Sequence, residues 1–173
     1  RLPIDRVFSL RGFGTVVTGT VADGAISTEE RVEVYPFGGA SKVRGMQVFG
    51  SGVERVSAGQ RAALNLPDLK HTELHRGQTA AAAGALAPTY LLNVRVEVLP
   101  TAPHALKTGT TALLHLHTQE TLANLHLAGG RKSLMPGESA IAQLRLPEVA
   151  CGWPGDRFIL RLPVFYLAGG QAP

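Results

Sequence analysis

The sequence contains a single cysteine, Cys151. One cysteine cannot form a disulfide within the chain, so a reducing compartment is expected and a secreted disulfide scaffold is excluded. No apolar run approaches the ~18 residues that a membrane helix needs, and no basic-then-apolar leader opens the chain. The first residues, 1–4, already have a strand-like pattern. We therefore expect a cytoplasmic fragment of a longer protein, with no membrane partner.

Signatures of catalysis are also missing. The sequence has no Gly-x-x-x-x-Gly-Lys-Ser/Thr phosphate loop, no Gly-x-Ser-x-Gly elbow, no Cys-x-x-Cys pair and no His-Glu-x-x-His. Gly12 and Gly14 superficially resemble a phosphate-binding turn, but a β-rich segment follows them, so no helix terminus would face a phosphate. His115, His117 and His126 could group on neighbouring strands, yet no convincing fourth zinc ligand lies near them. We expect no catalytic residue and no metal site.

The balance of residue types is that of a folded domain. Hydrophobic residues make up 45% and charged residues 17% of the 173 residues, and 20 glycines and 11 prolines lie between short apolar runs. The net charge is +4, divided evenly: residues 1–87 have 10 basic and 8 acidic residues, and residues 88–173 have 7 and 5. This charge is compatible with RNA but also with an ordinary protein surface.

Short β-rich runs recur along the whole chain. Such runs every 8–12 residues, some alternating between apolar and polar, predict antiparallel sheets. The runs span residues 15–21, 31–35, 41–48, 61–66, 91–99, 111–117, 122–127, 139–146 and 157–162. Residues 80–87 could form a short helix or a linker. We predict an all-β protein with two small closed antiparallel β-barrels in tandem, over residues 1–87 and 88–173.

Six segments resemble the second and third domains of translational GTPases of the elongation factor Tu class. Residues 2–21 resemble the opening of the second domain, and their core at residues 12–19 reads Gly-Phe-Gly-Thr-Val-Val-Thr-Gly, a long and specific match. Further matches follow in order at residues 42–48, 58–66, 76–78, 133–146 and 155–161. The variants Pro-Gly-Glu-Ser-Ala and Gly-Asp-Arg-Phe-Ile-Leu-Arg in the last two are closer to selenocysteine-specific factors than to the general one.

Two segments depart from that pattern. Glu29 and Glu30 replace the usual Gly-Asp before the third strand, so we expect a turn there that does not use a glycine conformation. Apolar Phe165 and Tyr166 stand near the end of the chain in place of polar residues, which leaves the contacts of the last strand open.

The resemblance implies a site for aminoacylated tRNA. It maps the pocket for the amino acid to Asp5, Arg6 and Arg61, and the terminal adenosine to Phe8, Leu10 and Gln47. The general factor has acidic, acidic and amide residues at the three pocket positions, whereas this chain has one acidic and two cationic ones. Selenocysteine is largely an anion at neutral pH, so two guanidinium groups would bind it by charge-assisted hydrogen bonds, and serine would leave them unneutralised.

The resemblance further implies partners: selenocysteinyl-tRNA, the ribosome, and a GTPase domain of the same protein that holds GTP and magnesium. The basic residues expected near the tRNA stems are Arg95, Lys107, Arg131, Lys132 and Arg145. Three alternatives stay open. The chain could be the equivalent domains of another translational GTPase, a protein-interaction pair without RNA binding, or a surface on which Asp5, Arg6 and Arg61 form only a weak salt-bridge cluster.

Overall fold

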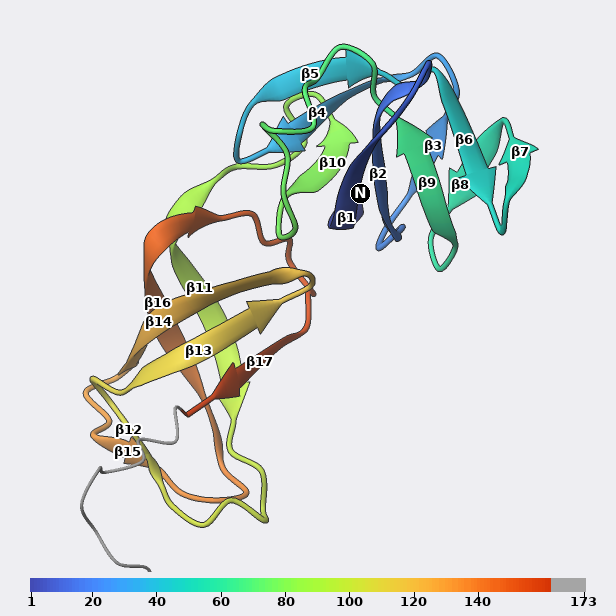
Figure 1. The fold of residues 1–173 in the computed structure, drawn as a ribbon. Coiled ribbons are helices and arrows are strands. Elements are labelled where there is room, and N and C mark those ends of the chain that lie inside the picture. Colours follow the sequence, from blue (N-terminus) through green and yellow to red (C-terminus); the bar gives the residue numbers. More distant parts are fainter. Residues whose placement is uncertain (163–173) are drawn as a thin grey trace, which may run out of the picture. The chain divides into compact units, whose positions relative to one another are not determined.

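A computed structural model of the chain describes residues 1–162, which form β-strands and connecting turns with no helix among them (Figure 1). The all-β prediction is confirmed. The chain divides into two compact units. The first contains residues 1–90 together with 116–120 and 148–158, and the second contains residues 91–115, 121–147 and the described residues from 159 onward.

Most strands of the first unit join one sheet. Its order is β5-β4-β10-β1-β2-β9-β6-β7, and β3 pairs with β8 separately. The strands are β1 (Leu2–Leu10), β2 (Gly14–Thr20), β3 (Ala25–Ser27), β4 (Arg31–Tyr35), β5 (Gly39–Lys42), β6 (Gly45–Val48), β7 (Ser51–Val53), β8 (Arg55–Ser57), β9 (Arg61–Asn65) and β10 (Thr79–Ala82).

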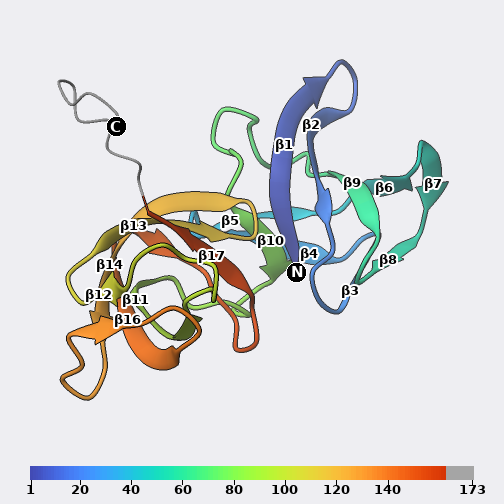
Figure 2. The same cartoon turned by 90° about the horizontal axis from the view of Figure 1, so that it is seen from below.

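The first strand joins two halves of this sheet. Its start pairs with β10 and the rest of it pairs with β2, so β1 and β2 run side by side as a hairpin (Figures 1 and 2). The register shifts between Ile4, which faces Gly19, and Arg6, which faces Thr18, so Asp5 occupies a β-bulge. Such a bulge bends the strand and redirects a side chain.

Gly19 is needed at this bulge for steric reasons. A Cβ atom there would lie 2.1 Å from the carbonyl oxygen of Pro3 and 2.7 Å from a methyl carbon of Leu2. Leu2 is fully buried, so neither neighbour is free to move away. The glycine that ends the 12–19 motif therefore permits the close approach of β1 and β2.

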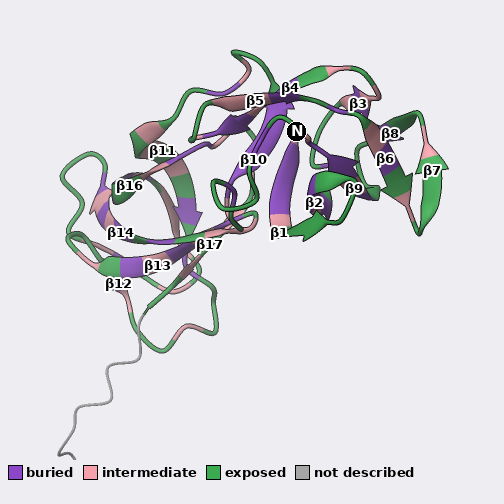
Figure 3. Cartoon of the chain, turned by 45° about the horizontal axis from the view of Figure 1, so that its top comes forward, coloured by how far each residue is buried: buried purple, intermediate pink, exposed green. Residues whose placement is uncertain are grey.

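The core of the first unit follows the period-2 alternation of its strands. Val17, Leu64 and Met46 face each other across β2, β9 and β6 and are buried, and Val7 packs against the same cluster. Figure 3 shows that the beginning of β1 is buried and its far end is exposed. The intervening residues of these strands therefore form the opposite, outer face of the sheet.

The second unit is built on a five-stranded sheet of order β11-β16-β14-β13-β17, with β12 paired to β15. Its strands are β11 (Thr89–Glu97), β12 (Leu106–Lys107), β13 (Thr111–Leu116), β14 (Gln119–Leu127), β15 (Ser133–Leu134), β16 (Ser139–Ala150) and β17 (Phe158–Arg161). Leu125 and Leu144 face each other across β14 and β16 and are fully buried.

A part-buried polar cluster centred on Asp156 lies within the first unit. Nη1 and Nη2 of Arg1 each donate to the Asp156 carboxylate at 2.9 Å, the backbone N–H of Trp153 donates to it at 2.7 Å, and His117 Nε2 lies 3.1 Å from it. The Arg1 guanidinium also lies 5.6 Å from the centre of the Trp153 ring. Burial alone would raise the pKa of Asp156, but these hydrogen bonds and charges lower it to about 2.

Several expectations from the sequence need correction. Residues 79–82 form strand β10, paired with both β1 and β4, so residues 80–87 contain no helix. Glu29 adopts the left-handed conformation, with φ of 67°, so this turn keeps a glycine-like backbone without a glycine. Hydrogen bonds fix it there, because the Glu29 N–H donates to Val43 O at 2.8 Å and Lys42 forms an ion pair with the Glu29 carboxylate.

Two other expectations are neither confirmed nor corrected by the structure. Strand pairing gives open sheets, with β5 and β7 at the edges of the first and β11 and β17 at the edges of the second, so closure into barrels stays a prediction. Phe165 and Tyr166 lie outside the described residues.

Candidate functional site

The outer face of the first sheet brings most of the predicted site residues together. Arg6, Thr18, Ala63 and Gln47 face each other in turn across β1, β2, β9 and β6. Neighbouring strands lie about 4.8 Å apart, so this row extends roughly 14 Å across the sheet. Arg61 lies two residues from Ala63 on the same strand and therefore on the same face.

Asp5 and Arg61 form a bidentate ion pair on this face. Arg61 Nη1 donates to Asp5 Oδ2, and Arg61 Nη2 donates to Asp5 Oδ1 at 3.1 Å. The hydroxyl of Thr18 also donates to Asp5 Oδ1, at 2.7 Å. Because Asp5 lies in the bulge, its side chain reaches the outer face beside that of Arg6. The structure therefore places all three predicted pocket residues on one face.

The charges of the two arginines act on the same carboxylate. Burial alone would raise the pKa of Asp5, but hydrogen bonds from Arg61 and Thr18, followed by the charges of Arg61 and Arg6, lower it below its usual range. The ion pair with Asp5 in turn raises the pKa of Arg61. Arg61 is 49% exposed, so the pair adds less than about 1 kcal/mol to stability. An anion near these residues would meet a net charge of +1, concentrated on the side of Arg6.

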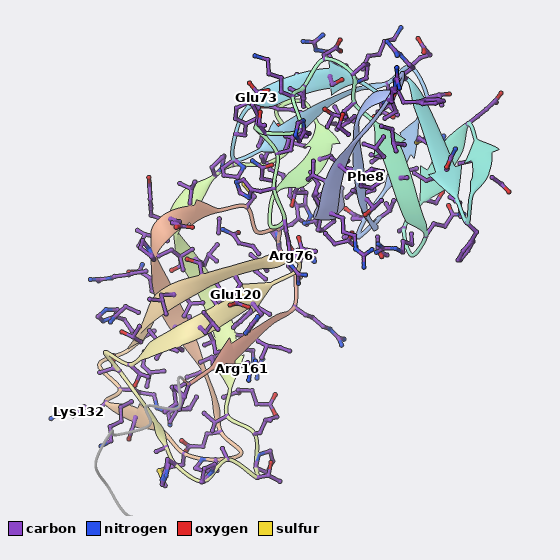
Figure 4. The ribbon with its side chains drawn as sticks, in the orientation of Figure 1. Phe8, Glu73, Arg76, Glu120, Lys132 and Arg161 are labelled. Carbon is purple, nitrogen blue, oxygen red and sulfur yellow. The ribbon has the colours of Figure 1, made fainter. Side chains whose placement is uncertain are left out.

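The residues predicted for the terminal adenosine are on the same face. Phe8 and Leu10 follow Arg6 at every second position of β1 and are 36% and 45% exposed. Figure 4 labels Phe8 in this part of the sheet. Gln47 is exposed on β6, three strands from Phe8. The face therefore combines an apolar end, a cationic part and an amide.

Sequence reasoning missed two features of this sheet. Thr18 donates a hydrogen bond to Asp5. It follows buried Val17 in the Thr-Val-Val-Thr-Gly run, and this alternation was a signal that its side chain points outward. Phe49, between β6 and β7, is 96% exposed with φ of 50°. No periodicity identifies it, because it lies in a turn.

The histidines do not form a metal site in the described part of the chain. His117 lies beyond the end of β13 at Leu116, with φ of 51°, so it does not share a strand face with His115. Within residues 1–162 no group of three or more His, Cys, Asp or Glu side chains is placed to hold a metal ion. Those residues also include no helix long and apolar enough to cross a membrane.

The basic residues of the second half differ in their partners. Arg131 donates to Glu138 Oε2 at 3.2 Å, so a carboxylate neutralises it. Arg95 donates to the Ser139 hydroxyl at 3.1 Å, and Arg145 to the amide oxygen of Gln143 at 3.2 Å. Neutral partners leave the charges of Arg95 and Arg145 available to an anion, which separates these two from Arg131.

Comparison with known proteins places the chain beside the elongation factor Tu class. It is 30% identical over 164 residues to "Elongation factor Tu 2" of Streptomyces avermitilis. This match covers 92% of this chain and 42% of that protein. No protein-family model matches the chain.

Within that class, the similarity is greater to selenocysteine-specific factors. The chain is 43% identical over 173 residues to a selenocysteine-specific elongation factor of Desulfomicrobium baculatum, covering 99% of this chain and 27% of that protein. The crystal structure of a bacterial selenocysteine-specific elongation factor matches 91% of the chain with a TM-score of 0.75 and 29% identity, over 24% of that structure's chain. The resemblance noted in the sequence is confirmed, and the chain spans about a quarter of the length of the two selenocysteine-specific factors that it matches.

Proposed function

We propose that this chain is the tRNA-binding part of a selenocysteine-specific translation elongation factor that delivers selenocysteinyl-tRNA to the ribosome. Two arginines beside a single carboxylate on the outer face of the first sheet are the observation that supports this proposal. The 43% identity to a factor of that name supports the same conclusion.

In this proposal the aminoacylated end of the tRNA lies along the outer face. Arg6 and Arg61, with Asp5 between them, hold the selenolate by charge-assisted hydrogen bonds. Phe8 and Leu10 offer an apolar surface to the terminal adenine, and Gln47 offers a hydrogen-bonding amide. A serine side chain has no charge and gains nothing from the two guanidinium groups, which is the basis of discrimination.

The remaining functions are assigned to other parts of the protein. GTP and magnesium would bind a separate GTPase domain, and this chain would carry no hydrolytic residue. The two segments 1–87 and 88–173 would each close into a β-barrel, with the second contacting the tRNA stems through Arg95 and Arg145. The protein would act in the cytoplasm, where aminoacyl-tRNA and ribosomes are found.

A test compares Arg61→Ala with the unmodified complete factor in its GTP-bound state. Binding of selenocysteinyl-tRNA should weaken by roughly 1.5–3 kcal/mol, the contribution of a charge-assisted hydrogen bond, and binding of seryl-tRNA should change much less. Arg131→Ala is the matched control, since it removes an ion-paired arginine that belongs to the second unit and not to this face. Equal losses for both tRNAs would mean that Arg61 contacts the phosphate backbone, as in a factor without selenocysteine specificity.

A further inference from the structure

The hydroxyl of Thr18 contacts the carboxylate that lies between the two arginines. Thr18 Oγ1 donates to Asp5 Oδ1 at 2.7 Å, and Arg61 approaches both oxygens of the same carboxylate. In register, however, Thr18 faces Arg6. The β-bulge therefore places Asp5 and Arg6 together against one threonine on the neighbouring strand.

The charges of two cations thus act on Asp5. Arg61 is bound to it, and the charge of Arg6 is close enough to lower the pKa of the same carboxyl. A carboxylate that could rotate freely would divide its time between the two guanidinium groups. The Thr18 hydrogen bond fixes Oδ1 and so keeps the carboxylate plane facing Arg61.

We propose that Thr18 is a positioning residue that commits Asp5 to Arg61 and thereby leaves Arg6 available to an anionic amino acid. This inference rests on the proposed function of the face. With Asp5 committed to Arg61, the Arg6 guanidinium has no hydrogen bond or ion pair among residues 1–162, and the net positive charge of the site is concentrated there. Without the hydroxyl, Asp5 turns partly toward Arg6, and a selenolate must compete with an internal carboxylate.

The consequence is a loss of selectivity with little loss of general binding. An anionic side chain needs an unpaired cation, whereas a serine side chain does not. The adenosine surface formed by Phe8 and Leu10 does not involve Thr18. Removal of the hydroxyl should therefore weaken selenocysteinyl-tRNA binding and leave seryl-tRNA binding nearly unchanged.

The experiment uses the complete factor in its GTP-bound state and measures dissociation constants for selenocysteinyl-tRNA and seryl-tRNA. Thr18→Val removes the hydroxyl while keeping the shape and the strand preference of the residue. Thr18→Ser keeps the hydroxyl and should restore selectivity. Thr20→Val is the matched control, because Thr20 lies on the same strand and face, opposite Arg61 in register, yet makes no hydrogen bond to Asp5 within the described residues.

We expect Thr18→Val to reduce the selenocysteine-over-serine affinity ratio about tenfold, the effect of one charge-assisted hydrogen bond, with Thr18→Ser and Thr20→Val close to the unmodified factor. An unchanged ratio in Thr18→Val overturns the inference, as does an equal loss for both tRNAs, which would mean that Thr18 only supports the sheet. An unmodified factor that binds both tRNAs equally overturns the proposed function itself, and that result appears before any variant is compared.

Discussion

Arg1 and Asp156 lie 155 positions apart in the chain and form a bidentate ion pair, in which both nitrogen-to-oxygen distances are 2.9 Å. Their side chains are 11% and 9% exposed. Trp153 and His117 complete the surroundings of the carboxylate, so a segment late in the sequence is fixed to the first residue of the chain within one compact unit.

This pair predicts a stability that depends on acid pH. The pKa of Asp156 is about 2 in the folded chain, against 3.8 for the free side chain. A depressed carboxyl pKa stabilises the fold above pH 3.8, and this contribution is lost as pH falls from there toward 2. Asp156→Asn should therefore lower the free energy of unfolding at pH 7 by about 2 kcal/mol or more, because it also removes the nearest carboxylate of part-buried Arg1 and leaves it the more distant Asp23, at 4.0 Å.

Urea unfolding at a series of pH values checks this prediction. The difference in free energy of unfolding between Asp156→Asn and the unmodified chain should have its largest value at pH 7 and become smaller below pH 4. Glu138→Gln is the control, because its ion pair with Arg131 is exposed and should contribute little at any pH. A pH-independent difference would show that the asparagine acts through packing alone.

Gly19→Ala should destabilise the first unit. Its Cβ would lie 2.1 Å from the Pro3 carbonyl oxygen, so β1 must move away from β2 at the bulge. Overpacking of this kind costs about 1–3 kcal/mol. Gly52→Ala, also within a strand, has open space around the added methyl group and should be close to neutral in a thermal unfolding measurement. Similar melting temperatures for the two variants would contradict the steric account of the motif.

Glu29→Gly should stabilise the first unit instead of destabilising it. A left-handed backbone costs a non-glycine residue roughly 1–2 kcal/mol, which outweighs the extra entropy of glycine in the unfolded chain and the exposed ion pair with Lys42. Chemical denaturation should show that the free energy of unfolding of this variant is higher by about 0.5 kcal/mol. Glu54→Gly, at an exposed turn without a positive φ, should lose stability instead, and a loss at both sites would mean that Glu29 is not strained.

These cases show which features were accessible from the sequence. Alternation and turn residues predicted the sheets, and the family resemblance of residues 2–21 and 58–66 assigned Arg6 and Arg61 to one pocket, which the structure places on one face. The Asp156 cluster was not predictable, because no local pattern links residues 155 positions apart. Residues 80–87, expected to form a short helix or a linker, misled for a related reason: alanine has the highest helix propensity, but propensity is a weak preference, and pairing with two neighbouring strands overrides it.

The last prediction concerns pH and the selectivity of the proposed site. A selenol is protonated in mildly acidic solution, whereas the pKa of Asp5 lies below its usual value of 3.8. Between these two titrations the selenocysteine side chain is neutral while Asp5 and both arginines keep their charges. The affinity ratio of selenocysteinyl-tRNA over seryl-tRNA for the complete factor should therefore fall toward one as pH drops through the selenol range, before Asp5 itself titrates. Seryl-tRNA provides the internal control, since its side chain has no proton to gain and any general acid effect would weaken both tRNAs. A ratio that stays constant over this range would mean that the face distinguishes the two amino acids by size or polarizability and not by charge, and the role proposed for Arg6 and Arg61 would then be wrong.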